Sequence, residues 1–217
     1  MALLLGGCDN YVVSDKPWFE VKDGGGAEIR FGWWAVKDDH CRFEVGAPST
    51  SWPECAEPLL ISQDWKGSLS SLAPDGVDYL LVSGKPLILQ YGVKGLRDGD
   101  KASDAYFYFG IEPQQRDGQG RLVALKFWPA LCGPPPPPDR KAPYRSRATK
   151  KPWPGMTLTS GGVCTAADVN ALRKAVLRSG RLVKADDENM SIRWLRERRS
   201  GDQSEADWLA VQGIRTQ

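Results

Sequence analysis

Few residues in this sequence have side chains suited to catalysis. His40, in the stretch KDDHC, is the one histidine, so a Ser-His-Asp triad has to use His40 or no histidine at all. A lone histidine beside two aspartates is more often an ordinary surface residue than a base or a metal ligand. The sequence contains no G-x-S-x-G, H-E-x-x-H or P-loop motif. Carboxylates are plentiful, and a glycosidase-like hydrolase that uses two of them as acid and base is the alternative hypothesis.

Four of the five cysteines lie far apart in the sequence, at Cys41, Cys55, Cys132 and Cys164. Zinc ligands usually come as close pairs two to four residues apart, and this spacing has no such pair, so we expect neither a metal site nor a cofactor. An even number of cysteines in an exported protein indicates disulfides. Of the three connectivities open to four cysteines, we favour Cys41–Cys55 and Cys132–Cys164.

The fifth cysteine follows a short apolar start, MALLLGGC. Leu5-Gly6-Gly7-Cys8 resembles the lipobox of bacterial lipoproteins. This resemblance implies that a signal peptide is cut before Cys8, that the Cys8 thiol carries a diacylglyceryl group, and that the new amino group is acylated. Two or three acyl chains then anchor the protein to a membrane, where one chain would bind only weakly.

The lipobox resemblance also predicts how the N-terminal region is organised. A secretory signal has about 7–15 apolar residues after a basic region, so residues 1–7 represent a truncated signal peptide whose natural start lies upstream. Residues 8–26 form a lipidated tether that ends in three glycines. We therefore expect the protein to face the periplasm of a bacterial cell envelope. Asp9 resembles the inner-membrane retention signal of enteric lipoproteins, and the choice between inner and outer membrane stays open.

Aromatic residues are the second unusual feature, with nine tryptophans among 217 residues. One interpretation is that large rings line a pocket for an apolar ligand or a sugar. The other is that they fill the core of a small β-rich domain. Adjacent residues of a strand point to opposite faces, so both interpretations can hold at once. The candidate ligand-lining residues are Trp33, Trp34, Tyr106, Tyr108 and Trp128.

The central part of the sequence predicts a β-rich domain over residues 27–132. Two apolar runs flank the turn sequence Ser83-Gly84-Lys85-Pro86, and two more flank Asp117-Gly118-Gln119-Gly120. Both patterns are typical of hairpins. Together they predict an α+β, β-rich fold, built as an antiparallel meander or a small barrel-like sheet.

Residues 133–155 open with Gly133 and five consecutive prolines and are rich in basic side chains. Proline runs form stiff polyproline II segments and join neither helix interiors nor sheet ladders. One interpretation is that the segment binds a partner protein or contacts anionic lipid headgroups. The other is that it is a rigid crossover loop closed by Cys132–Cys164. The net charge is −5 for residues 1–132 and +7 for residues 133–217. The basic residues of the segment are Arg140, Lys141, Arg145, Arg147, Lys150 and Lys151.

One amphipathic helix is predicted over Thr165–Ser179, packed on the sheet. Thr165 with Asp168 resembles a capping box, and Gly180 is expected to end the helix. Residues 181–198 are predicted to form a hairpin that turns at 187–189, and residues 204–217 a short helix. Residues 156–217 would thus complete the domain.

These patterns favour a membrane-anchored envelope lipoprotein that acts as a non-enzymatic binding or structural module. The expected partners are the membrane, through Cys8, and an envelope protein or an apolar ligand. The basic residues 133–217 could face anionic lipid, nucleic acid or an acidic partner, and nucleic acid is not among the partners we expect.

Overall fold

The computed structural model describes residues 10–25, 27–36, 40–61, 77–98, 101–136, 149–159, 163–183, 191–199 and 202. The chain forms two compact units, and each is assembled from three stretches. The first unit comprises residues 1–26, 80–111 and 127–186, and the second comprises residues 27–79, 112–126 and 187–217.

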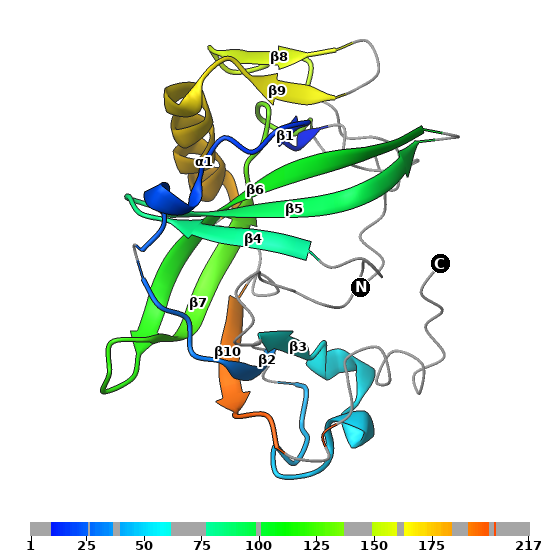
Figure 1. Ribbon diagram of the computed structural model, residues 1–217, viewed down its shortest axis with the longest axis vertical. Helices are drawn as coiled ribbons and strands as arrows, with labels where there is room; N and C mark the ends of the chain where they lie inside the picture. Colours follow the sequence, from blue (N-terminus) through cyan, green and yellow to red (C-terminus); the bar gives the residue numbers. More distant parts are fainter. Residues whose placement is uncertain are drawn as a thin grey trace. The chain divides into compact units, whose positions relative to one another are not determined.

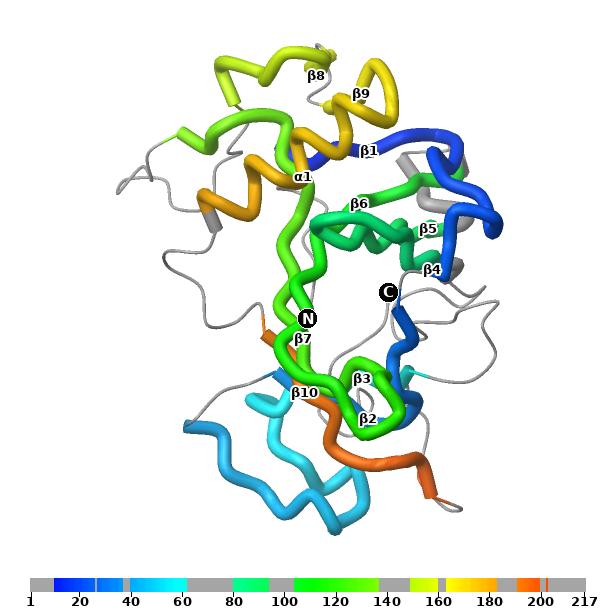
Figure 2. Tube along the Cα trace, turned by 90° about the vertical axis from the view of Figure 1, so that its left-hand side faces the viewer, coloured from blue at the N-terminus to red at the C-terminus, as the bar shows by residue number. Residues whose placement is uncertain are grey.

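The first unit contains an antiparallel sheet, one α-helix and one short 3-10 helix, which confirms the predicted α+β, β-rich class. Its strands run in the order β7-β6-β5-β4, and β1 pairs with β6. Figures 1 and 2 both show helix α1 and the small β8–β9 sheet on one side of strands β4, β5 and β6. The bounds are β1 Val13–Ser14, η2 Val21–Asp23, β4 Val77–Val82, β5 Leu87–Asp98, β6 Lys101–Arg116, β7 Leu122–Pro129, β8 Met156–Leu158, β9 Cys164–Ala166 and α1 Val169–Val183.

Both predicted hairpins are present, because their turn residues have the required backbone and side-chain chemistry. Gly84, between β4 and β5, has φ +142°, and Gly120, between β6 and β7, has φ +80°; both values favour glycine. Asp117 Oδ1 accepts hydrogen bonds from the main-chain N–H groups of Gln119 and Arg121, each at 3.0 Å. The aspartate therefore closes the turn that the sequence pattern located.

The predicted bounds of the helix are wrong at both ends. Residues Cys164–Ala166 form strand β9, and the side chain of Asp168, not Thr165, accepts from the N–H of Ala171 at 2.7 Å. The helix also continues through Gly180 to Val183. A Cβ at residue 180 would lie 2.7 Å from the indole ring of Trp128, so this glycine permits a close helix–sheet contact and does not end the helix.

The core of the first unit lies between α1 and the sheet. Leu172, Ala175 and Val176 of α1 are buried against Ile88, Tyr108 and other apolar side chains. The buried hydroxyl of Ser179 accepts a hydrogen bond from the N–H of Leu131 at 2.8 Å. Burial and this polar contact together fix the helix on one sheet face.

The second unit contains a sheet in the order β3-β2-β10-β7, with β2 at Gly32–Val36, β3 at Leu59–Ile61 and β10 at Ser191–Arg196. Two short 3-10 helices, η3 Ser49–Ser51 and η4 Glu54–Ala56, lie between β2 and β3. Its core gathers Trp33, Trp52 and Leu60 with Cys41 and Ala56.

The predicted C-terminal hairpin is corrected by the structure. Arg181–Val183, expected in the first strand of that hairpin, belong to α1, and β10 pairs with β2 and β7. The predicted turn at 187–189 and the predicted helix at 204–217 lie outside the described residues. No helix in the described part of the chain is long and apolar enough to cross a membrane.

Candidate functional site

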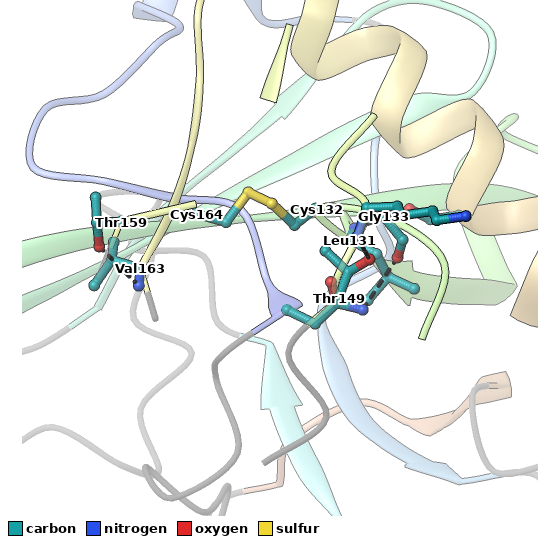
Figure 3. Close-up of a disulfide and its surroundings, with 10 residues drawn as sticks. Leu131, Cys132, Gly133, Thr149, Thr159, Val163 and Cys164 are labelled. Carbon is teal, nitrogen blue, oxygen red and sulfur yellow. Dashed lines mark hydrogen bonds between the residues drawn. A yellow bond between two sulfur atoms is a disulfide. The ribbon is translucent and has the colours of Figure 1, made fainter. Parts of the chain in front are cut away.

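Both expected disulfides are present, and they differ in exposure. Cys132 and Cys164 are joined by a disulfide (Figure 3). Both are fully buried, and their Cα atoms are 5.8 Å apart. Cys41 and Cys55 are joined with Cα atoms 5.7 Å apart; Cys41 is buried and Cys55 is exposed. The first bond is therefore part of the core of the first unit, whereas the second reaches the surface of the second unit.

The Cys132–Cys164 disulfide stands where four separate chain segments meet. The N–H of Cys132 donates to the carbonyl of Asn10 at 2.6 Å, and Asn10 Nδ2 donates to the carbonyl of Gly133 at 3.1 Å. A Cβ on Gly133 would lie 2.5 Å from the carbonyl oxygen of Lys151. Asn10, Gly133 and Lys151 thus lie close together beside the disulfide.

Most basic residues of that loop, Arg140, Lys141, Arg145 and Arg147, lie outside the described residues. Lys150 and Lys151 are described, and both are exposed. Cys8 and the rest of the predicted lipobox also lie outside the described residues.

Two of the five candidate ligand-lining residues, Trp33 and Trp34, are fully buried in the second unit. The indole Nε1 of Trp33 donates to Asp202 Oδ2 at 3.2 Å, and its ring meets that of Trp52 edge-on. Trp34 Nε1 donates to the carbonyl of Arg30 at 3.0 Å. The polar atoms of both tryptophans are thus satisfied within the unit, as a core position requires.

The other three candidates, Tyr106, Tyr108 and Trp128, belong to the core side of the first unit. The hydroxyl of Ser14 donates to the carbonyl of Lys16, so the Tyr108 hydroxyl donates to Ser14 Oγ, at 2.6 Å. Burial raises the pKa of Tyr108 to about 12. The structure therefore distributes the five candidates over two units and buries four of them.

A different set of aromatic rings lies on the opposite face of the first unit's sheet. Tyr108 points toward α1, so its neighbours Phe107 and Phe109 point away from it. Tyr91 on β5 is paired with Phe107, and Phe127 on β7 contacts Phe109. All four rings are half-buried. We call Tyr91, Phe107, Phe109 and Phe127 the aromatic row.

The rings of the aromatic row are tilted against one another. The ring centroid of Tyr91 lies 6.5 Å from those of Phe107 and Phe109, at interplanar angles of 60° and 89°. The ring centroids of Phe109 and Phe127 are 6.2 Å apart, at an angle of 67°. Edge-to-face packing of this kind is favourable, and along the row some rings present an edge and others a face to the surface. Such a surface suits contact with an irregular apolar group better than stacking on one flat ring.

The sequence indicated the alternating aromatic residues of strand β6, but not which of them lie on the face away from the helix. The run Tyr106-Phe107-Tyr108-Phe109 alternates between the two faces of β6. Sequence alternation shows that two aromatic pairs exist, but it does not show which face the helix covers.

The best-defined carboxylates of the second unit are engaged by arginines. Arg196 makes a two-pronged ion pair with Asp202, and the two side chains are only 8% and 5% exposed. Hydrogen bonding to Arg196 lowers the pKa of Asp202 to about 2, against the opposing effect of burial. A carboxyl group with this pKa stays ionised near neutral pH, so Asp202 is unsuited to act as a general acid.

Asp117 is held in a similar way. Burial alone would raise the pKa of Asp117, but hydrogen bonds from the Arg121 side chain and from main-chain N–H groups lower it overall. Arg30 lies 3.7 Å from the same carboxylate and stacks on the ring of Trp194. These side chains stabilise the second unit through ion pairing and stacking.

His40 is exposed. Among the described residues, no three histidine, cysteine, aspartate or glutamate side chains are grouped so that they could hold a metal ion.

Comparison with known proteins adds no relative. No protein family, no curated protein and no solved structure matches this chain.

Proposed function

We propose that this protein is a lipid-anchored lipoprotein of the bacterial cell envelope that acts as a non-enzymatic binding module. The aromatic row is its binding surface, and an apolar ligand is the proposed occupant. The observation that carries the binding role is a row of four half-buried rings on the sheet face opposite α1.

The two disulfides support the proposed compartment. Disulfides persist in secreted and periplasmic proteins and are rare in a reducing cytosol. The Cys132–Cys164 bond is buried in the core of the first unit, so we expect it to form as the protein folds. Attachment through Cys8 remains a proposal that rests on the lipobox resemblance alone.

The contacts of the aromatic row support an apolar ligand. Leu89 is paired with Phe109, and Tyr91 with Phe107, so apolar side chains of β5 and β6 share this face. Half-buried rings gain free energy when an apolar group removes the rest of their surface from water.

Binding of the apolar fluorophore N-phenyl-1-naphthylamine tests this function. The oxidised protein is expected to bind the probe with increased fluorescence. The double variant Phe107→Thr/Phe127→Thr keeps β propensity and is expected to bind at least about tenfold more weakly, because two rings no longer cover the probe.

The matched control is Val21→Thr, which makes a similar change at a valine that is 88% exposed and outside the row. Thermal unfolding of each variant shows whether the fold is intact. A wild-type protein that does not bind the probe, or a folded double variant that binds it as well as the control, would contradict the proposal.

A further inference from the structure

Helix α1 carries a concentration of positive charge. Its fifteen residues, Val169–Val183, include Arg173, Lys174, Arg178 and Arg181 and no aspartate or glutamate. In the part of the chain that the structure describes, Lys174 and Arg181 make no ion pair. Among the described residues, these two cations therefore have no acidic partner.

Two leucines are exposed among these cations. Leu177 is 45% exposed and Leu182 is 43% exposed, although Leu172 and Val176 of the same helix are fully buried. Lys174 and Arg181 lie three residues before and four residues after Leu177, which places all three side chains on neighbouring positions of the helix surface. The outer face of α1 thus combines cations with apolar side chains.

The segment before β8 contacts the helix and also carries cations. Gly155 packs closely on Ala171 of α1, and the guanidinium of Arg178 lies 5.8 Å from the ring centroid of Trp153. Lys150 and Lys151, which shortly precede Trp153, are exposed. Arg173, in contrast, donates to the carbonyl of Ser83 and is directed toward the fold.

We propose that the outer face of α1 docks on an anionic phospholipid surface, and we call it the docking face. This proposal rests on the proposed envelope location for access to a membrane, but it does not depend on Cys8. The docking face consists of Lys150, Lys151, Lys174, Leu177, Arg178, Arg181 and Leu182.

Cations and leucines have complementary roles at such a surface. Lysine and arginine near an anionic leaflet are attracted to its lipid headgroups, and their aliphatic stems lie along apolar surface while the charges stay in water. Leucines on the same helix enter the boundary between headgroups and acyl chains. A soluble polyanion would engage the cations alone, so the exposed leucines favour a membrane as the occupant.

The test uses the full chain with Cys8→Ser, which removes the acylation site. Sedimentation with vesicles of phosphatidylglycerol and phosphatidylcholine is expected to show binding that weakens as salt is added. Vesicles of phosphatidylcholine alone are expected to bind far less protein. Adding Lys174→Gln/Arg181→Gln is expected to weaken binding about 25-fold, at about fivefold per charge.

Two further variants separate charge from insertion. Leu177→Ser is expected to weaken vesicle binding about fivefold while leaving most of the salt dependence unchanged. The matched control Arg42→Gln/Arg193→Gln removes the same charge from exposed positions of the second unit and is expected to change binding less than about twofold.

Equal binding to both vesicle types, or equal losses in the control and in Lys174→Gln/Arg181→Gln, would overturn the proposal. Binding to soluble polyphosphate without binding to vesicles would also overturn it. The tested protein lacks Cys8, so a failure to bind vesicles would not contradict lipid anchoring through Cys8. Conversely, an unacylated Cys8 in the wild-type protein would contradict the anchoring but not the vesicle binding.

Discussion

The indole Nε1 of Trp128 donates a hydrogen bond to the main-chain carbonyl of Val176 at 2.8 Å. This bond joins strand β7 to the middle of helix α1. The ring fits there because neither Gly110 of β6 nor Gly180 of α1 has a Cβ, which would lie 2.3 Å and 2.7 Å from the ring. The position of the helix thus depends on one tryptophan held between two glycines.

Gly180→Ala is therefore expected to destabilise the protein. Alanine gains about 1 kcal/mol over glycine in a helix, but overpacking in a well-packed core costs about 1–3 kcal/mol. We expect the cost to prevail, because the hydrogen bond to Val176 holds the Trp128 ring in place. Urea unfolding measures the change. Gly118→Ala, where a Cβ meets nothing within 4 Å, is the control, and equal stability of the two variants would disprove this packing role.

The Arg196–Asp202 pair predicts acid sensitivity. The folded-state pKa of Asp202 is about 2, below its ordinary value of 3.8, so its contribution is complete above pH 4 and is lost as the pH falls toward 2. This contribution amounts to about 2 kcal/mol. Asp202→Asn is expected to unfold more easily near neutral pH by about 3 kcal/mol and to show a flatter stability profile between pH 4 and pH 2.

Urea unfolding at a series of pH values measures both effects for Asp202. Glu54→Gln, at an exposed position, serves as the control. An Asp202→Asn profile as steep as that of the wild type would show that another group causes the acid sensitivity.

The raised pKa of Tyr108 predicts a loss of stability at alkaline pH. Its folded-state pKa is about 12, above the ordinary 10, so the folded protein retains a proton that the unfolded chain releases, and stability falls as the pH rises from 10 to 12. Spectrophotometric titration of tyrosine ionisation is expected to show a late component near pH 12. Tyr108→Phe should lack this component; if it persists, the component belongs to another tyrosine.

The two disulfides are expected to differ in their response to reductant. Cys55 is exposed, whereas Cys132 and Cys164 are fully buried, so dithiothreitol should reduce Cys41–Cys55 first under native conditions. Differential alkylation and peptide mass spectrometry identify the free cysteines at each time. Simultaneous loss of both bonds would show that access to the buried bond does not limit its reduction.

Local turn and pairing signals in the sequence predicted the hairpins well. Asp117 and the glycines at 84 and 120 have chemistry that only a few turn conformations use, so the positions of the turns were readable. The disulfide pairing followed from the same preference for neighbours in the chain.

Features that depend on contacts between residues far apart in the sequence could not be predicted from the sequence. Gly180 looks like a helix stop until Trp128, far away in sequence, is seen to require the space. Likewise, whether Tyr108 or Phe109 points into the core depends on which sheet face α1 covers. The assignment of candidate ligand-lining residues therefore required the tertiary structure.

The intact mass of the protein, expressed in a bacterium from its natural upstream DNA, tests lipid anchoring and disulfide bonding together. The expected mass begins at a diacylglyceryl-modified and acylated Cys8 and rises by four hydrogens after reduction of Cys41–Cys55 and Cys132–Cys164. An unmodified N-terminus with free thiols would contradict the proposed envelope lipoprotein.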